Sequence, residues 1–276
     1  MIATLLVLAG LTCSAAPTRP DTIIEVRSLG EGVFLLSVPE PIDRIRVGNI
    51  LLVASQDGSL LVDTGVEGLG ELLVETVSGL TPGPVRYVVN THPHLDHIGG
   101  NERFAREADI VRGDSRDPEL GISVGESRTL SVGNRSVVVF RPPAAHSTAD
   151  LVVHVPAAGV IHMGDLLVQG YPFIDAERGG SIDGLIAAVG WALGRARDNT
   201  VIVRGHGEPV TRAELLAYQR MLGTVRNQVR ALLRDGRTED EIVAAAPTAA
   251  FDSQWGSGFL SPASWVRMVV RGIRGL

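Results

Sequence analysis

The sequence predicts an α/β protein in which two packed β-sheets carry helices on their outer faces, within one domain. Groups of short apolar strands followed by a helix occur twice along the 276 residues, which is typical of this layered arrangement. Hydrophobic residues make up 45% of the chain, enough for one large core, and the length is too short for two ordinary domains with separate cores. No internal repeat or linker interrupts the pattern.

The first half of the chain alternates apolar strands with one helix. Segments rich in Val, Leu and Ile predict strands over residues 33–38, 48–54, 59–63 and 85–90. Gln56-Asp57-Gly58 supplies a hairpin turn between two of them. Between Leu69 and Leu80, apolar residues recur at helical spacing and predict a helix.

The second half adds more strands and then helices with clear start signals. Strands are expected within residues 108–141 and over 151–155, 160–163 and 201–203. Ser181 can cap a helix that runs to about Leu193, with Gly194 just past its end. Capping boxes at 211–214 and 238–241 open two helices, and Pro247 closes the second. Ser261-Pro262 opens a last one.

The helix after Thr211 has one apolar stripe. Its members recur at steps of three and four, namely Leu215, Tyr218, Leu222, Val225, Val229 and Leu232. We expect this stripe to pack on the core, the alternative being a membrane or partner face.

Composition excludes several functions. All 25 basic residues are arginine, so no Schiff-base lysine or P-loop lysine exists in this chain. The net charge of −6 and the 4% aromatic content predict no nucleic-acid partner. Cys13 is the one cysteine, which excludes an internal disulfide and a zinc–cysteine cluster.

The amino-terminal residues have the shape of an export signal. Residues 2–11 are apolar, and Ser14, Ala15 and Ala16 supply small residues for cleavage. The run is too short for stable membrane insertion, and no basic residue precedes it. We expect a signal peptide over 1–16 and a periplasmic or secreted protein, with a cytoplasmic protein as the alternative.

Three of the seven histidines fall within six residues, in the segment His92-Pro93-His94-Leu95-Asp96-His97. Pro93 favours an extended conformation at His92, in which residues two apart point to the same side. His92 and His94 can therefore converge on one metal ion. The apolar strand before them places the motif at a strand's end, where Asp96 and His97 begin a helix and can reach a second ion.

Three further candidates each follow an apolar strand: His146, Asp165 and His206. With His92 and His94, His146 would hold one ion, whereas Asp96, His97 and His206 would hold the other. Asp165 has an oxygen for each ion and would bridge them. Imidazole and carboxylate ligands without thiolate suit two Zn²⁺ ions, with Fe or Mn as substitutes. A solvated histidine-rich loop is the plain alternative.

This constellation resembles that of the metallo-β-lactamase superfamily. The resemblance extends from about Ile23 to the helix after Thr211. It implies a four-layer αββα sandwich, the metallo-β-lactamase fold, with the metals at one edge of the paired sheets. Residues 17–276 would form a single such domain, with C-terminal helices over about 211–276. The resemblance also implies that Asp63 supports a ligand histidine without binding metal itself.

The expected function is a binuclear zinc hydrolase. Hydroxide held between the ions would attack an ester, thioester, lactone or amide bond of a small substrate, and Asp96 would orient or carry the proton. The resemblance implies that Asp at position 165 favours the thioesterase (glyoxalase II-like), lactonase and phosphodiesterase branches, because β-lactam-hydrolysing enzymes typically carry Cys or Ser there. A class B-type β-lactamase, an iron-containing oxidoreductase and a non-enzymatic zinc-binding protein are the alternatives.

Four remaining residues have weaker assignments. His154 lies within the alternating pattern of the expected strand 151–155, and His162 lies three residues before Asp165. We interpret both as structural or supporting residues without a metal role. Tyr171 and Phe173 follow Asp165 and would run along the rim of the site, where either could contact substrate. A loop packed on its own aromatic residues is an equal alternative.

Overall fold

The computed structural model describes residues 23–113 and 122–275. The expected signal peptide and Cys13 lie outside these residues. The strands are β1 (Glu25–Gly30), β2 (Val33–Ser37), β3 (Ile50–Val53), β4 (Ser59–Val62), β5 (Val85–Val89), β6 (Asp109–Arg112), β7 (Ile122–Ser123), β8 (Ser127–Val132), β9 (Arg135–Phe140), β10 (Val152–Val155), β11 (Val160–His162) and β12 (Val201–Val203). The helices are α1 (Gly70–Leu80), α2 (Leu95–Ile98), α3 (Ile182–Leu193), α4 (Arg212–Arg234), α5 (Glu239–Ala244), α6 (Asp252–Trp255) and α7 (Pro262–Arg274).

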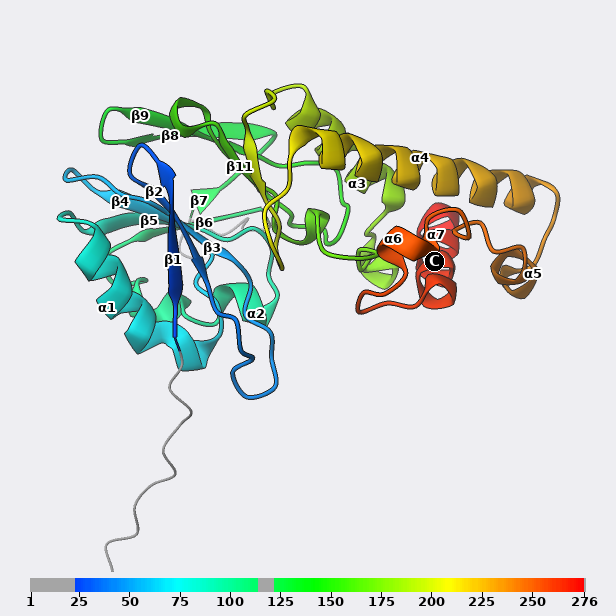
Figure 1. Cartoon of the computed structure of the whole chain (residues 1–276), viewed down its shortest axis with the longest axis horizontal. Helices are drawn as coiled ribbons and strands as arrows, with labels where there is room; N and C mark the ends of the chain where they lie inside the picture. Colours follow the sequence, from blue (N-terminus) through cyan, green and yellow to red (C-terminus); the bar gives the residue numbers. More distant parts are fainter. Residues whose placement is uncertain (1–22, 114–121, 276) are drawn as a thin grey trace, which may run out of the picture.

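The first sheet has the strand order β1-β2-β3-β4-β5-β6-β7 (Figure 1). Strands β1 to β4 form an antiparallel meander, and the turn at Gly58, with a φ of 127°, joins β3 to β4 as the sequence predicted. From β4 onward the neighbours are parallel. A parallel connection needs a crossover, which α1 provides between β4 and β5.

The second sheet has the order β12-β11-β10-β9-β8. Its strands β8 to β11 pair antiparallel, whereas β11 and β12 are parallel. Both sheets therefore contain parallel strands whose carboxyl ends can present loops at the same edge. Ligands commonly bind beyond such carboxyl ends.

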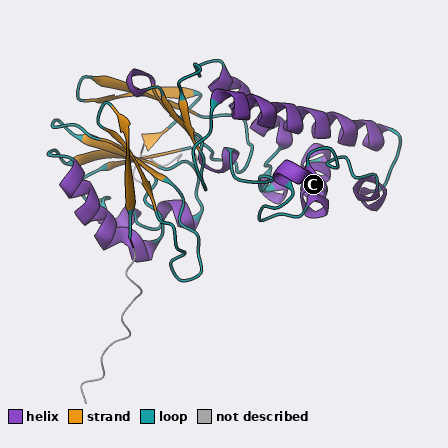
Figure 2. Ribbon diagram, in the orientation of Figure 1, coloured by secondary structure: helices purple, strands orange, loops and turns teal. Residues whose placement is uncertain are grey.

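The structure has four layers, in the order helix, sheet, sheet and helix (Figure 2). Three clusters of buried apolar residues lie between neighbouring layers. Successive residues of β3 point to opposite faces, so Ile50 and Leu52 pack toward α1 while Leu51 and Val53 pack between the sheets. On the far side, the second sheet packs against α3, α4 and α7. Each fully buried Val or Leu contributes about 1.5–3 kcal/mol of transfer free energy. The expected αββα sandwich is confirmed.

The helix start signals act as predicted. The side chains of Ser181 and Ser261 accept the N–H of the third helical residue, and both capping boxes are formed, at Thr211 and Thr238. Of the apolar stripe on α4, all but the half-buried Leu232 are buried in the core, because α3 and α7 cover that face. The stripe is therefore a core face.

Some elements differ from expectation. Strand β1 and the single-turn helix α6 were not singled out in the sequence, and α5 ends at Ala244, before Pro247. Gly194 ends α3 in right-handed conformation, with a φ of −65°, so no left-handed turn needs a glycine there. Within residues 23–113 and 122–275, no helix combines the length and apolar character needed to cross a membrane.

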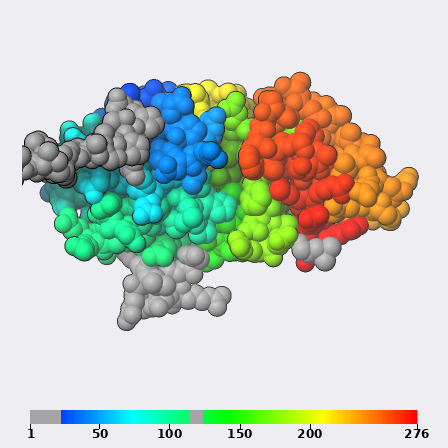
Figure 3. All heavy atoms as spheres, turned by 90° about the horizontal axis from the view of Figure 1, so that it is seen from below, coloured from blue at the N-terminus to red at the C-terminus, as the bar shows by residue number. Residues whose placement is uncertain are grey.

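The candidate site lies where the sandwich meets the C-terminal helices. Helix α2 lies at the edge of the first sheet that faces these helices (Figure 1). The segment after Asp165 reaches the C-terminal part of the chain, where Gly170 lies against Gly258. In the space-filling view, a groove separates the β2–β3 segment, in blue, from the orange and red C-terminal residues (Figure 3).

Candidate metal centre

Seven side chains from four loops converge at one edge of the two sheets. The loop after β5 and the first turn of α2 carry four of them, the β9–β10 loop carries one, and the segments after β11 and β12 carry one each. They are His92, His94, Asp96, His97, His146, Asp165 and His206. The structure thus brings together all seven residues that the sequence indicated.

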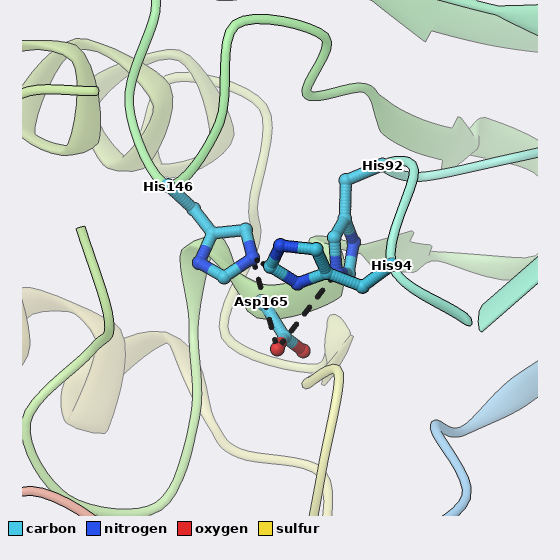
Figure 4. Close-up of side chains that lie close together, drawn as sticks. All are labelled: His92, His94, His146 and Asp165. Carbon is cyan, nitrogen blue, oxygen red and sulfur yellow. Dashed lines mark hydrogen bonds and ion pairs between the residues drawn. The ribbon is translucent and has the colours of Figure 1, made fainter. Parts of the chain in front are cut away.

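The first group consists of His92, His94, His146 and Asp165 (Figure 4). The Nε2 of His146 lies 3.1 Å from the Nδ1 of His94. The Oδ2 of Asp165 lies 3.9 Å from the Nε2 of His92 and 3.9 Å from the Nε2 of His146. His92 and His94 share this group, as the extended conformation before Pro93 predicted.

The second group consists of Asp96, His97 and His206. The Oδ2 of Asp96 lies 3.1 Å from the Nε2 of His206 and 3.6 Å from the Nε2 of His97. The two imidazole Nε2 atoms are 3.3 Å apart. This division of the seven residues into two groups is the one predicted from their positions in the sequence.

Asp165 lies between the two groups. Its Oδ2 faces the first group, whereas its Oδ1 lies 3.4 Å from the Nε2 of His97 and 3.6 Å from the Nε2 of His206. A carboxylate in this position offers one oxygen to each group, which is the arrangement expected of a shared ligand.

The chemistry of the first group and of the shared Asp165 fits bound cations. The Nε2 of His92 and the Oδ1 of Asp165 are buried and have no hydrogen-bond partner among the described residues. Burial lowers the pKa of His92 well below its usual value and also lowers that of His146, so both imidazoles are neutral and carry a free lone pair. Against the effect of burial, the surrounding histidines hold the pKa of Asp165 well below its usual value. Neutral imidazoles around a carboxylate are a donor set for a divalent metal.

The pKa of His97 is shifted in the opposite direction from those of His92 and His146. The carboxylates of Asp165 and Asp63 outweigh the effect of burial and raise the pKa of His97 well above its usual value. A cation in the second group would replace the proton on this imidazole, since metal ligands must be deprotonated. The two groups of His and Asp residues are together consistent with a dinuclear metal site.

Asp63 supports the second group from a fully buried position. Its carboxylate accepts the N–H and the hydroxyl of Thr91, each at 2.7 Å, and the Nδ1–H of His97 at 2.8 Å. It therefore fixes which nitrogen of His97 faces the cluster, because Nδ1 is occupied. The supporting contact to a histidine implied by the resemblance is present.

Two glycines that the sequence analysis did not single out shape the centre. A Cβ on Gly48 would overlap the ring of His97, and a Cβ on Gly205 would overlap the Oδ1 of Asp165. Gly205 directly precedes the candidate ligand His206, and this adjacency was the one signal in the sequence that could have indicated its role. Gly48 lies before β3, far along the chain from every candidate residue, and offered none.

The remaining histidines stay outside both groups. His162 is fully buried and hydrogen-bonds to the main chain at Asn49 and Gly164. His154 is half-buried in β10, with its ring 6.3 Å from Trp191 and edge-on to it. Both positions agree with a structural or supporting role.

Tyr171 and Phe173 have different surroundings. Tyr171 is 2% exposed, stacks on Trp265 with ring centroids 4.4 Å apart and donates to Asp252 at 2.7 Å, so it belongs to the core. Phe173 lies beside the first group, its ring centroid 6.2 Å from that of His94 and 5.8 Å from that of His146. Its carbonyl also accepts the Nδ1–H of His146 at 3.0 Å. Phe173 is therefore the aromatic residue at the centre.

The fold and this cluster define a metallo-β-lactamase-fold protein with a His/Asp metal centre. A sequence profile of the "Metallo-beta-lactamase superfamily" matches residues 43–113. In the solved structures, a metallo-beta-lactamase from Pontibacter korlensis superimposes with a TM-score of 0.60 at 22% identity, over 73% of this chain and 99% of that one. The sec-alkylsulfatase Pisa1 from Pseudomonas sp. gives 0.73 at 14% identity, over 92% of this chain and 51% of that one. The chain is therefore similar to the metallo-β-lactamase superfamily in sequence over residues 43–113 and shares the metallo-β-lactamase fold.

Curated relatives share part of their length with the chain. The human metallo-beta-lactamase domain-containing protein 1 is 34% identical over 164 residues, covering 55% of this chain and 59% of that protein. A hydroxyacylglutathione hydrolase from Maricaulis maris is 33% identical over 88 residues, covering 30% of this chain and 34% of that protein. The chain thus spans about three fifths of the first relative and a third of the second.

Proposed function

We propose that the protein is a binuclear zinc hydrolase that cleaves an ester, thioester, lactone or amide bond of a small substrate. The observation that carries this proposal is the position of Asp165, whose two carboxylate oxygens face two separate groups of ligand side chains. A storage or buffering protein needs metal ligands but has no need for two groups joined through one carboxylate. The paired arrangement therefore favours catalysis over zinc binding alone.

Seven residues would hold the two ions. His92, His94 and His146 would hold one ion, Asp96, His97 and His206 the other, and Asp165 would contact both. Two bound divalent cations supply a water molecule of lowered pKa and polarise the substrate's carbonyl oxygen.

Asp96 is the residue that we assign to proton transfer. Its Oδ2 faces His206, and its side chain is 23% exposed, so water and substrate can reach it. Although burial raises the pKa of Asp96, the hydrogen bond from His206 lowers it overall and keeps the carboxylate ionised at neutral pH. Asp96 accepts a proton as the water oxygen bonds to the carbonyl carbon. The leaving oxygen, sulfur or nitrogen takes this proton when its bond to that carbon breaks.

The substrate class that we favour is an uncharged thioester, ester or lactone. A carboxylate at position 165 repels the carboxylate that penicillin-type substrates carry near the scissile bond. The relative from Maricaulis maris is by its name a hydrolase of an acylated glutathione, and this similarity supports the thioester branch. A β-lactamase, or an iron-containing enzyme on the same fold, is the second candidate.

Metal analysis and a substrate panel test the proposal together. Protein purified without chelator should contain about two divalent ions per chain, mostly zinc, and should hydrolyse at least one thioester, ester or lactone. His94→Ala should remove one ion, and Asp165→Ala should weaken the binding of both. A single ion, with iron dominant, would support the oxidoreductase instead. Two zinc ions without turnover of any substrate tried would favour the non-enzymatic alternative.

A further inference from the structure

We propose that Gly48 and Asn49, which contribute no ligand, assemble the second ligand group, and that Asn49 is a positioning residue for His206. This inference rests on the metal-binding part of the proposed function and not on hydrolysis. The two residues precede β3 and contact the main chain at Asp96 and around His206, and the ring of His97. Their contacts therefore act on the second group, and their one link toward the shared Asp165 runs through the main-chain carbonyl of Asn49, which a side-chain substitution leaves in place.

Asn49 holds the chain on both sides of His206. Its Nδ2 donates to the carbonyl of Arg204 at 3.0 Å and to that of Gly207 at 2.7 Å. Its main-chain N–H donates to the carbonyl of Gly205 at 2.7 Å. Asn49 is only 5% exposed, so these bonds are shielded from water. Because the three carbonyls bracket position 206, one asparagine fixes where the imidazole of His206 stands.

A second connection runs through His162 to the shared carboxylate. The Nδ1 of His162 faces the N–H of Gly164 at 3.1 Å, and its Nε2 faces the carbonyl of Asn49 at 3.0 Å. An N–H can only donate and a carbonyl can only accept, so Nδ1 is the acceptor and Nε2 carries the proton. Gly164 immediately precedes Asp165. The buried ring of His162 therefore links Asn49 to the segment that carries Asp165.

Gly48 completes the assembly on the α2 side. Its N–H donates to the carbonyl of Asp96 at 3.1 Å, and its backbone lies against the ring of His97, where a Cβ would overlap it. The dipeptide thus contacts the main chain of Asp96, the ring of His97 and the segment around His206. These three residues are the whole second group.

The three histidines of the first group are held by different contacts. His146 donates to the carbonyl of Phe173, and the Nδ1 of His92 lies 3.0 Å from the hydroxyl of Thr91. Among the described residues, no hydrogen bond joins Asn49 to the chain next to His92, His94 or His146. Loss of the Asn49 side chain should therefore weaken binding of the ion in the second group and leave binding of the ion in the first group nearly unchanged. A residue with a merely structural role would lower stability without this selectivity.

The test measures the two ions separately. Asn49→Ala is made in a His94→Ala background, which leaves only the second group, and in a His206→Ala background, which leaves only the first. Zn²⁺ affinity is measured by competition with a chromophoric chelator, and the melting temperature of the metal-free protein is recorded alongside. In the His94→Ala background, where only the second group is left, we expect Asn49→Ala to weaken Zn²⁺ binding about tenfold or more, as for other residues that orient metal ligands. In the His206→Ala background, where only the first group is left, we expect Zn²⁺ binding to weaken less than about threefold.

Two further variants keep the result interpretable. Asn49→Ser keeps a polar group at this buried position but is too short to reach both carbonyls, so it should give the same selective loss, in smaller measure, if Asn49→Ala does not fold. Ser59→Ala breaks the buried 2.7 Å bond between the hydroxyls of Ser59 and Thr81, far from the centre, and should lower the melting temperature without changing either affinity.

Two outcomes would overturn the inference: equal weakening in both backgrounds, or no weakening in either. If the parent protein carrying Asn49 binds no second Zn²⁺ ion at all, the proposed dinuclear site itself is wrong. The two failures are therefore distinct.

Discussion

Gly205 and the carboxylate of Asp165 are in such close contact that a Cβ on residue 205 would overlap the Oδ1 of Asp165. The main chain of Gly205 is fixed there by its N–H, which donates to the carbonyl of Gly164 at 2.7 Å. Neither partner can retreat, because the hydrogen bond ties residue 205 to the segment carrying Asp165. The absence of a side chain at position 205 is thus a condition for the position of the shared carboxylate.

Gly205→Ala should displace Asp165 and reduce bound metal from about two ions per chain toward one or none. We expect hydrolysis to fall at least about a hundredfold, since a small misplacement of catalytic groups has costs of this size. Elemental analysis and steady-state kinetics on one preparation provide the measurement. Gly79→Ala, in α1 with nothing within 4 Å of its added Cβ, is the matched control and should keep both metal and activity. Full metal content in Gly205→Ala would contradict the steric argument.

Phe173 should favour substrates with an apolar group beside the scissile bond, because its half-buried ring lies next to His94 and His146. Phe173→Ala should lower kcat/KM for a butanoyl ester about fivefold more than for the acetyl ester of the same alcohol, as expected when a hydrophobic contact is lost. Phe173→Leu retains an apolar side chain and should show a smaller difference. Equal losses on both esters would show that the ring of Phe173 only supports His94 and His146 and does not contact the substrate.

Asp150 should make the metal-free protein less stable as the pH rises. Burial raises the pKa of Asp150 from 3.8 to about 7, against the hydrogen bonds that it accepts from the N–H and hydroxyl of Ser147. Between these two pH values the folded chain holds a proton that the unfolded chain has released. The stabilisation is thus complete below about pH 4 and lost as the pH passes 7, at most on the order of 4 kcal/mol.

The measurement for Asp150 is a comparison by chemical denaturation from pH 5 to pH 8. The parent protein should lose stability relative to Asp150→Asn over this range, because the amide does not titrate. Metal is removed from both proteins by a chelator, so that the titration of the metal ligands is common to both. Parallel stability curves for the two proteins would mean that Asp150 is already ionised at pH 5.

The charge of Asp165 should decide between substrate branches. We expect kcat/KM for an uncharged thioester, ester or lactone to exceed that for penicillins at least about tenfold, which equals roughly 1.4 kcal/mol of transition-state discrimination. Asp165→Ser should narrow this gap, although loss of metal would lower both rates, so metal occupancy is measured in each sample. Penicillin or carbapenem turnover that matches or exceeds every ester and thioester would replace this assignment by that of a β-lactamase.

The amino-acid sequence alone identified the fold class and the seven clustered residues, because their signals are local. The segment from His92 to His97 places four of them within six residues, and Asp165 and His206 each follow a strand whose apolar pattern is plain. The capping boxes at Thr211 and Thr238 are likewise contained within four residues. Signals of this kind depend on neighbours along the chain, so they can be interpreted without a three-dimensional structure.

Only the tertiary structure decided which other residues build the centre. Asn49 bonds to His162 across 113 positions and to Gly207 across 158, and no local pattern marks it as different from any asparagine before a strand. The same holds for Tyr171 and Phe173, which lie two residues apart, one buried on Trp265 and the other beside His146. Backbone direction at each of these positions is set by how the two sheets and the C-terminal helices pack, and packing depends on contacts between residues far apart in the chain.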